Sequence, residues 1–154
     1  MAGNAGKPKV GGPRSAARLA AVQALYQLAM SDDPKPKLVV EEYENHRLGA
    51  EIEGDQYVPA DVNMFGDVVL GAWERREEVD GTLAGCLSAD WSIDRLENII
   101  HAIFRAAGYE LIARPDVPTA VIINEYVDVA HGFYERAEAS FVNGVLDKFA
   151  KAVR

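Results

Sequence analysis

Cysteine is almost absent from this chain of 154 residues, and the single one, Cys86, cannot form an intramolecular disulfide. A disulfide-stabilised secreted scaffold is therefore excluded. Long hydrophobic runs are also missing, because no apolar stretch approaches the roughly 20 residues that a membrane-spanning helix needs. The first residues lack the apolar segment of a secretory signal peptide. These absences predict a soluble, cytoplasmic protein without a membrane segment.

Recognisable catalytic and metal-binding motifs are missing as well. His46, His101 and His131 have no second histidine or cysteine at the spacing of metal ligands. The chain contains no HExxH, no phosphate-binding P-loop and no GxSxG. Cys86 could act as a nucleophile only with a base from elsewhere in the fold, and a small semi-buried cysteine is the commoner outcome. We therefore predict a protein that is not an enzyme, with no metal and no cofactor.

The charge is unevenly distributed along the chain. The net charge is −8, from 16 basic and 24 acidic residues. Residues 1–31 contain four of the basic residues and no acid, which leaves 12 basic and 24 acidic groups in the rest. A basic end on an acidic body can contact a phosphate backbone locally, and the body suits a basic protein partner. An ordinary acidic domain with a solvated tail gives the same pattern, so the charge alone does not decide between them.

Helical periodicity dominates the sequence after a glycine- and proline-rich start. We predict that residues 1–13 form a flexible basic arm and that residues 14–154 form the folded domain. The Ala- and Leu-rich segment 14–30 predicts a first helix, and Pro13 is tolerated at its start. Apolar spacing predicts five further helices, over residues 37–48, 61–79, 92–114, 118–130 and 137–152.

Local signals complete this prediction. Asp61 and Ser92 are expected to be N-caps and Gly49 a C-cap. Residues 50–60 are expected to form a loop, and residues 81–88 an irregular stretch. The hairpin signal Asn143-Gly144 lies inside a helical pattern, so we interpret it as helix. The predicted fold is an all-α bundle of about six or seven helices, arranged as one domain or two small subdomains.

Two arginines stand out on the first helix. Arg14 and Arg18 lie about 40° apart on a helical wheel, in the same sector as the apolar stripe. Because a charge cannot replace a core residue without a partner, we expect the first turns to overhang the core. Both guanidinium groups then point into solvent or toward a ligand, and phosphate suits their planar fork. Pairing with acidic groups of the body is the equally weighted alternative. Glu125, on an apolar helix, is interpreted as a semi-buried carboxylate with a structural hydrogen bond.

Three ordered motifs resemble those of the NusB family of bacterial transcription antitermination factors. The first is AVQALY at residues 21–26, which follows the two arginines. The second is FRAAGYEL at residues 104–111. The third combines VPTAVIINEYVDVA at residues 117–130 with FVNGVLDK at residues 141–148. The resemblance covers roughly residues 14–154 and implies a helical-bundle fold.

The resemblance also implies a function. Members of this family bind boxA-type single-stranded RNA with the ribosomal protein NusE, as part of an RNA polymerase antitermination complex acting on ribosomal RNA operons. By resemblance, Arg14 and Arg18 are expected to contact RNA phosphates. Phe141 is expected to lie beside RNA and could stack on a base. Its spacing with Val145 and Phe149 is equally typical of a core-facing stripe.

The same resemblance predicts a partner surface of Tyr26, Asp94 and Arg105, and an ordinary surface residue is the open alternative for Asp94 and for Arg105. The chain departs from the family pattern at several positions, each of which removes a charge: Ser15 and Ala16 replace arginines, Ile100-His101 replaces an acidic–basic pair, and Ser140 replaces a lysine. These changes keep an alternative open, a divergent NusB-fold protein-interaction module with weak or no specific RNA binding. An RNA methyltransferase fragment is a further class, but no Gly-rich cofactor motif supports it.

Overall fold

The computed structural model describes residues 12–48 and 60–154, and these residues are helical with no strand. The predicted all-α fold is therefore confirmed for the described chain. A short 3₁₀ turn, η1 (Ile93–Arg95), accompanies seven α-helices. The helices are α1 (Pro13–Met30), α2 (Pro36–His46), α3 (Val62–Glu74), α4 (Arg76–Ala84), α5 (Asn98–Ala113), α6 (Thr119–Phe133) and α7 (Arg136–Val153).

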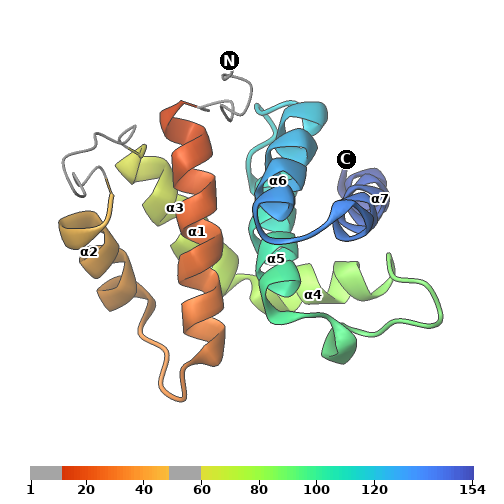
Figure 1. Cartoon of the computed structure of the whole chain (residues 1–154), viewed down its shortest axis with the longest axis horizontal. Helices are drawn as coiled ribbons and strands as arrows, with labels where there is room; N and C mark the ends of the chain where they lie inside the picture. Colours follow the sequence, from red (N-terminus) through yellow and green to blue (C-terminus); the bar gives the residue numbers. More distant parts are fainter. Residues whose placement is uncertain (1–11, 49–59) are drawn as a thin grey trace.

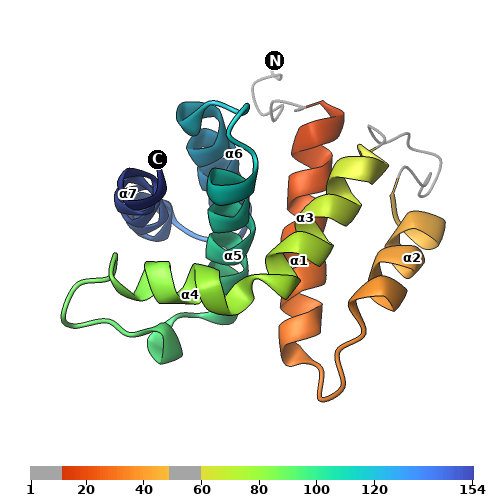
Figure 2. The ribbon, with the colours of Figure 1, turned by 180° about the vertical axis from the view of Figure 1, so that it is seen from behind.

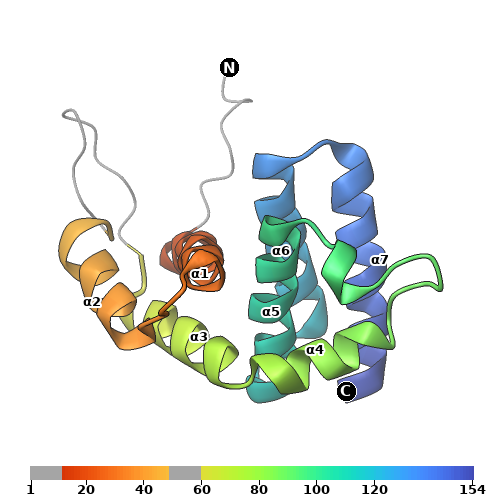
Figure 3. The ribbon, with the colours of Figure 1, turned by 90° about the horizontal axis from the view of Figure 1, so that it is seen from below.

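The helices form two halves that meet along α1 and α5. Helices α1, α2 and α3 lie on one side of Figure 1, and α4, α5, α6 and α7 lie on the other; Figure 2 shows the same division from behind. Seen from below, α3 leads into α4, which runs past α5 toward α7 within the second half (Figure 3). Because α5 contacts α1 and α3 as well as α4, α6 and α7, its buried residues belong to the cores of both halves.

Capping explains where several helices begin and end. Pro13 occupies the first turn of α1, where its missing N–H costs nothing. The carboxylate of Asp61 accepts a hydrogen bond from the backbone N–H of Met64 at 3.0 Å, so the predicted N-cap of α3 is confirmed. Helix α5 ends at Arg114, before Pro115, as the restricted backbone before a proline predicts.

Two predicted boundaries were wrong. The helix predicted over residues 61–79 is broken at Arg75, and α4 continues to Ala84, through the first half of the stretch expected to be irregular. Ser92 precedes only η1 and makes no capping bond. Glu97 caps α5 instead, because its Oε1 accepts from the backbone N–H groups of Ile99 and Ile100 at 3.0 and 3.4 Å.

The remaining predictions concern the ends of helices and the loops. Helix α7 spans one residue more at each end than predicted, and Asn143-Gly144 lies inside it, as interpreted. Three predictions fall largely outside the described residues: most of the arm, all but one residue of the 50–60 loop, and the C-cap Gly49. None of the helices in the described ranges is long and apolar enough to cross a membrane.

Candidate nucleic-acid interface

Arg14 and Arg18 lie one turn apart on α1 in opposite environments. Arg14 is exposed, whereas Arg18 is only 3% exposed. The expectation that both guanidinium groups face solvent is therefore wrong for Arg18. The first turns of α1 do not overhang the core, because α1 packs on α5 and α6. Carboxylates from those two helices provide the partners that a buried charge requires.

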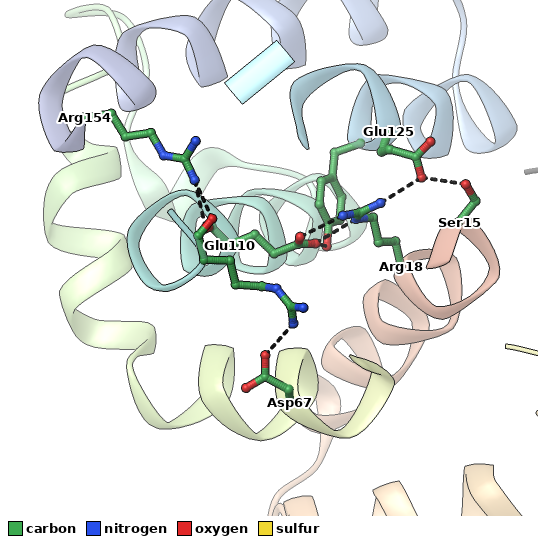
Figure 4. Close-up of polar contacts among 8 residues, drawn as sticks. Ser15, Arg18, Asp67, Glu110, Glu125 and Arg154 are labelled. Carbon is green, nitrogen blue, oxygen red and sulfur yellow. Dashed lines mark hydrogen bonds and ion pairs between the residues drawn. The ribbon is translucent and has the colours of Figure 1, made fainter. Parts of the chain in front are cut away.

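Arg18 forms a bidentate ion pair with Glu110 of α5. Its Nε donates to Oε2 at 2.9 Å and its Nη2 to Oε1 at 2.9 Å, and Glu110 is fully buried. Tyr126 of α6, also fully buried, donates its hydroxyl to the same Oε2 at 2.5 Å. Figure 4 shows Arg18 reaching Glu110 between the helices. One buried carboxylate thus joins α1, α5 and α6.

Glu125 of α6 extends this network toward the surface. Its Oε1 accepts from Nη1 of Arg18 at 3.1 Å and from Oγ of Ser15 at 2.6 Å (Figure 4). Its side chain is 25% exposed. The interpretation of Glu125 as a semi-buried carboxylate with a structural hydrogen bond is confirmed. These bonds fix the N-terminal end of α1, which carries Arg14, against α6.

The protonation states of this network follow from its burial and charge. Burial alone would lower the pKa of the Arg18 guanidinium, but the hydrogen bonds and charge of Glu110 raise that pKa above its ordinary value. Burial, reinforced by the charge of Glu110, raises the pKa of Tyr126 well above its ordinary value. Arg18 therefore stays charged and Tyr126 stays a neutral hydrogen-bond donor at neutral pH.

Arg154 binds the C-terminal end of α5, the same end that carries Glu110. Its guanidinium donates to the backbone carbonyls of Leu111 at 2.9 Å, Arg114 at 2.8 Å and Val117 at 2.7 Å. Figure 4 places Arg154 beside the last turn of α5. The last carbonyls of a helix have no backbone N–H partner within the helix. A side chain from outside the helix donates to them here. The last turn of α5, which carries Glu110, is thus bound by Arg18 from α1 and by Arg154 from the end of α7.

Phe141, in the second turn of α7, is half-buried between two aromatic rings. The ring centroid of Trp91 lies 5.4 Å away with 40° between the planes, and that of Phe104 lies 6.0 Å away at 63°. Phe104 is fully buried, whereas Trp91, between α4 and η1, is 42% exposed. Phe141 thus packs on the core and also reaches the surface. Its position fits both a base-stacking residue and a member of a core-facing stripe.

The structure does not bring the predicted RNA contacts together. The first turn of α1 lies at the top of Figure 1, whereas the segment between α4 and η1, on which Phe141 packs, lies at the lower right. An RNA strand that touched both Arg14 and Phe141 would therefore have to cross a large part of the surface.

The predicted partner residues fall into two groups. Tyr26 is 36% exposed on α1, and Asp94 is exposed in η1. Arg105, in contrast, is bound within the chain. Its Nη2 donates to Oδ2 of Asp80 at 2.7 Å, and its side chain is only 15% exposed.

Asp80 connects α4 to α5 through two basic side chains. Besides Arg105, His101 places Nε2 2.8 Å from Oδ1 of Asp80, so this histidine has a partner inside the fold. Burial alone would raise the pKa of Asp80, but the hydrogen bonds of His101 and Arg105 hold that pKa below its ordinary value. The carboxylate therefore contributes to stability while it is ionised.

This shift predicts an acid-dependent contribution to stability. Because the pKa of Asp80 is lower in the folded protein, its contribution is present above the pKa of the unfolded carboxyl, about 4, and is lost as the pH falls below it. We expect Asp80→Asn to lower the Tm near neutral pH, with the two Tm values converging as the pH falls through the lowered pKa of the folded Asp80 carboxyl. Thermal unfolding followed by circular dichroism across this pH range measures the difference.

The control is Glu77→Gln, which removes an exposed carboxylate from the same helix. A Tm difference between wild type and Asp80→Asn that stayed constant from neutral to acid pH would contradict the assignment.

Comparison with known proteins decides the family. Residues 15–151 match the model of the NusB family. The chain belongs to the NusB family. Transcription antitermination protein NusB of Novosphingobium aromaticivorans is 54% identical over 144 residues, which cover 94% of this chain and 97% of the relative. The protein of the same name from Sphingopyxis alaskensis is 49% identical over 141 residues, covering 92% and 94%.

Solved NusB structures share the fold. T. maritima NusB superimposes with a TM-score of 0.74 at 28% identity, covering 90% of this chain and 91% of that one. A crystal structure of the antitermination factors NusB and NusE in complex with dsRNA contains a chain that matches with a TM-score of 0.72 at 24% identity, covering 90% and 96%. The resemblance inferred from the three motifs is therefore confirmed.

Within this NusB fold, sequence reasoning missed Glu110 and Trp91. Glu110 lies in the FRAAGYEL motif, and it is the only acidic residue of the otherwise largely apolar α5. An isolated acid on such a helix is the signal that could have identified a partner for Arg18. Ser15, which stands where the family resemblance predicts an arginine, bonds to Glu125 instead.

Proposed function

We propose that this NusB-family chain is a transcription antitermination factor that binds boxA-type single-stranded RNA with the ribosomal protein NusE, in the cytoplasm, within an RNA polymerase antitermination complex. The observation that carries the proposal is the family match over residues 15–151, supported by relatives named transcription antitermination protein NusB at up to 54% identity. The exposed aromatic and basic side chains of this chain fit such a role, because proteins hold single strands by phosphate contacts and base stacking.

Each predicted site residue takes a role in this proposal that its environment allows. Arg14, exposed at the start of α1, contacts phosphate, and Phe141 offers its ring to a base. Arg18 acts as a positioning residue, since its guanidinium is occupied by Glu110 and Glu125. The partner surface includes the exposed Tyr26 and Asp94. Arg105, bound to Asp80, supports that surface from inside the fold.

The proposed role is binding without catalysis. Cys86, the one thiol of the chain, is 5% exposed and lies 3.4 Å from the backbone carbonyl of Thr82. Burial raises the pKa of its thiol, and the charge of Lys148 lowers it only in part, so this cysteine is a poor nucleophile. The described residues hold no group of three or more side chains that could bind a metal ion.

A second function is favoured by one observation. With Arg18 buried, Arg14 is the only guanidinium that the first turns of α1 present to solvent, on a chain whose net charge is −8. A NusB-fold module that binds NusE and has little specific affinity for RNA would have this surface.

The test is fluorescence anisotropy of a labelled boxA-type RNA, titrated with the chain alone and with NusE, at two salt concentrations. A scrambled RNA is the control. Tighter binding of boxA than of the scramble, strengthened by NusE, supports the antitermination role. Equal affinity for both RNAs, with NusE still bound, establishes the interaction module instead.

Arg14→Ala tests the phosphate contact directly. Each phosphate contact to a single strand contributes about 0.7 to the slope of log affinity against log salt, so we expect that slope to fall by about 0.7. The Tm should not change, because Arg14 is exposed. Arg47→Ala, which removes the same charge from an exposed position at the end of α2, should leave the slope as in wild type.

A further inference from the structure

The segment between α4 and η1 presents a tryptophan in a fixed position. Trp91, at 42% exposure, is the most exposed aromatic side chain among the described residues. Its backbone N–H donates to the carbonyl of Ser88 at 2.9 Å, and Nη1 of Arg95 donates to the carbonyl of Asp90 at 2.7 Å. The turn is therefore held by its own hydrogen bonds. An aromatic ring that is already in place loses little conformational entropy when a ligand stacks on it.

Trp91 and Phe141 form a continuous aromatic surface. Their centroids are 5.4 Å apart, and Phe141 is anchored in turn on the buried Phe104. The buried part of the Trp91 ring is thus supported by α7, while the exposed part has no function in packing. The exposed part of the indole is therefore available to stack on a ligand.

One basic side chain contacts this pair, and a second follows on the same side of α7. The guanidinium carbon of Arg95 is 5.5 Å from the centroid of Trp91. Lys148 is exposed and follows Phe141 by two helical turns of α7, so both lie on the same side of that helix. Asp90 and Asp94 flank the same turn and oppose these charges. Aromatic rings interleaved with cations are the arrangement that single-stranded nucleic acids require.

We propose that Trp91 is a base-stacking residue, which together with Phe141 forms the surface on which an unpaired base of the RNA stacks. The inference rests on the proposed RNA-binding function and extends it to a residue outside the three family motifs. Arg95, whose guanidinium lies over the indole, and Lys148 contact the adjoining phosphates. The occupant is a single-stranded base, because a paired base has both of its faces covered by its neighbours in the helix.

Tryptophan fluorescence tests the stacking directly. The chain has two tryptophans, and Trp73→Phe leaves Trp91 as the only one while conserving a ring beside Arg76. We expect boxA-type RNA to quench the emission of this variant over the same concentration range in which anisotropy reports binding. Binding by anisotropy without quenching would overturn the inference and leave the proposed function intact.

Affinity measurements with variants give the second readout. Removing one stacking ring weakens single-strand binding by about 5- to 150-fold, so Trp91→Ala should raise the Kd for RNA by a factor in that range. Trp91→Phe, which keeps an aromatic ring and guards against a folding defect, should raise it less. Leu38→Ala, on α2 and 57% exposed in wild type, is the matched control and should bind as wild type does.

Each outcome separates the two hypotheses. If wild type does not bind RNA at all, the proposed function fails, and the stacking role fails with it. If wild type binds RNA and Trp91→Ala binds equally well, only the stacking role fails. If Trp91→Ala loses affinity for NusE while its Kd for RNA alone is unchanged, the aromatic surface belongs to the protein partner and the inference is overturned.

Discussion

Replacing Arg18 by alanine should lower the free energy of unfolding by about 3–5 kcal/mol, because removal of one member of a buried ion pair leaves the other charge without compensation. The charge left behind is that of Glu110, which has no exposed surface. The hydroxyl of Tyr126 still donates to it, but one neutral donor does not replace a bidentate guanidinium. Urea unfolding followed by circular dichroism measures the loss.

Arg18→Lys and Arg75→Ala are the matched variants. A lysine retains the charge but cannot reproduce two parallel bonds to one carboxylate, so it should restore only part of the stability. Arg75 forms an exposed ion pair with Glu78 at 2.8 Å, and its loss should cost about 0–1 kcal/mol. If Arg18→Ala were as stable as Arg75→Ala while RNA affinity fell sharply, Arg18 would be a phosphate contact rather than a positioning residue.

Gly71→Ala should destabilise the protein by about 1–3 kcal/mol, the range typical of an overpacked core. A Cβ at this position would lie 2.2 Å from Cζ and 2.4 Å from the hydroxyl oxygen of Tyr109. The ring cannot swing away freely, because its hydroxyl donates to Oδ1 of Asp67 at 2.7 Å. The close approach of α3 to α5 therefore depends on glycine at residue 71.

Gly144→Ala is the matched control, since a Cβ there meets no atom within 4 Å. This glycine lies inside α7, where alanine is favoured over glycine by about 0.5–1 kcal/mol, so the control should stabilise the protein. Opposite signs for the two substitutions in urea unfolding are the expected result. Equal destabilisation of both would contradict the steric argument at residue 71.

Local signals predicted the helices well where capping chemistry determines their ends. Asp61 begins α3 as expected, and the last helix differs by one residue at each end. The break at Arg75 could not be predicted, because no glycine or proline marks it and both flanking segments have helical periodicity. Ser92 misled the prediction because serine is a preferred N-cap residue, whereas Glu97, which is not, caps the helix through its carboxylate.

The candidate site was only partly predictable for a different reason. Helical spacing correctly placed Arg18 in the sector of the apolar stripe, and pairing with an acid was one of the two alternatives. The choice between them depends on Glu110, 92 residues away, and no periodicity links two positions at that distance. The family, in contrast, could be recognised from short motifs, because each motif is read from neighbouring residues of the sequence and needs no contact between distant helices.

The ion pair between Arg18 and Glu110 has a consequence for biosynthesis. Helix α1 leaves the ribosome first, but its buried guanidinium acquires a partner only after a further 92 residues have been made. Helix α3 also buries part of its surface against α5. The first half therefore emerges with apolar faces and one charge that no other helix yet covers. Chains that pause before α5 is made would expose these groups to chaperones and proteases.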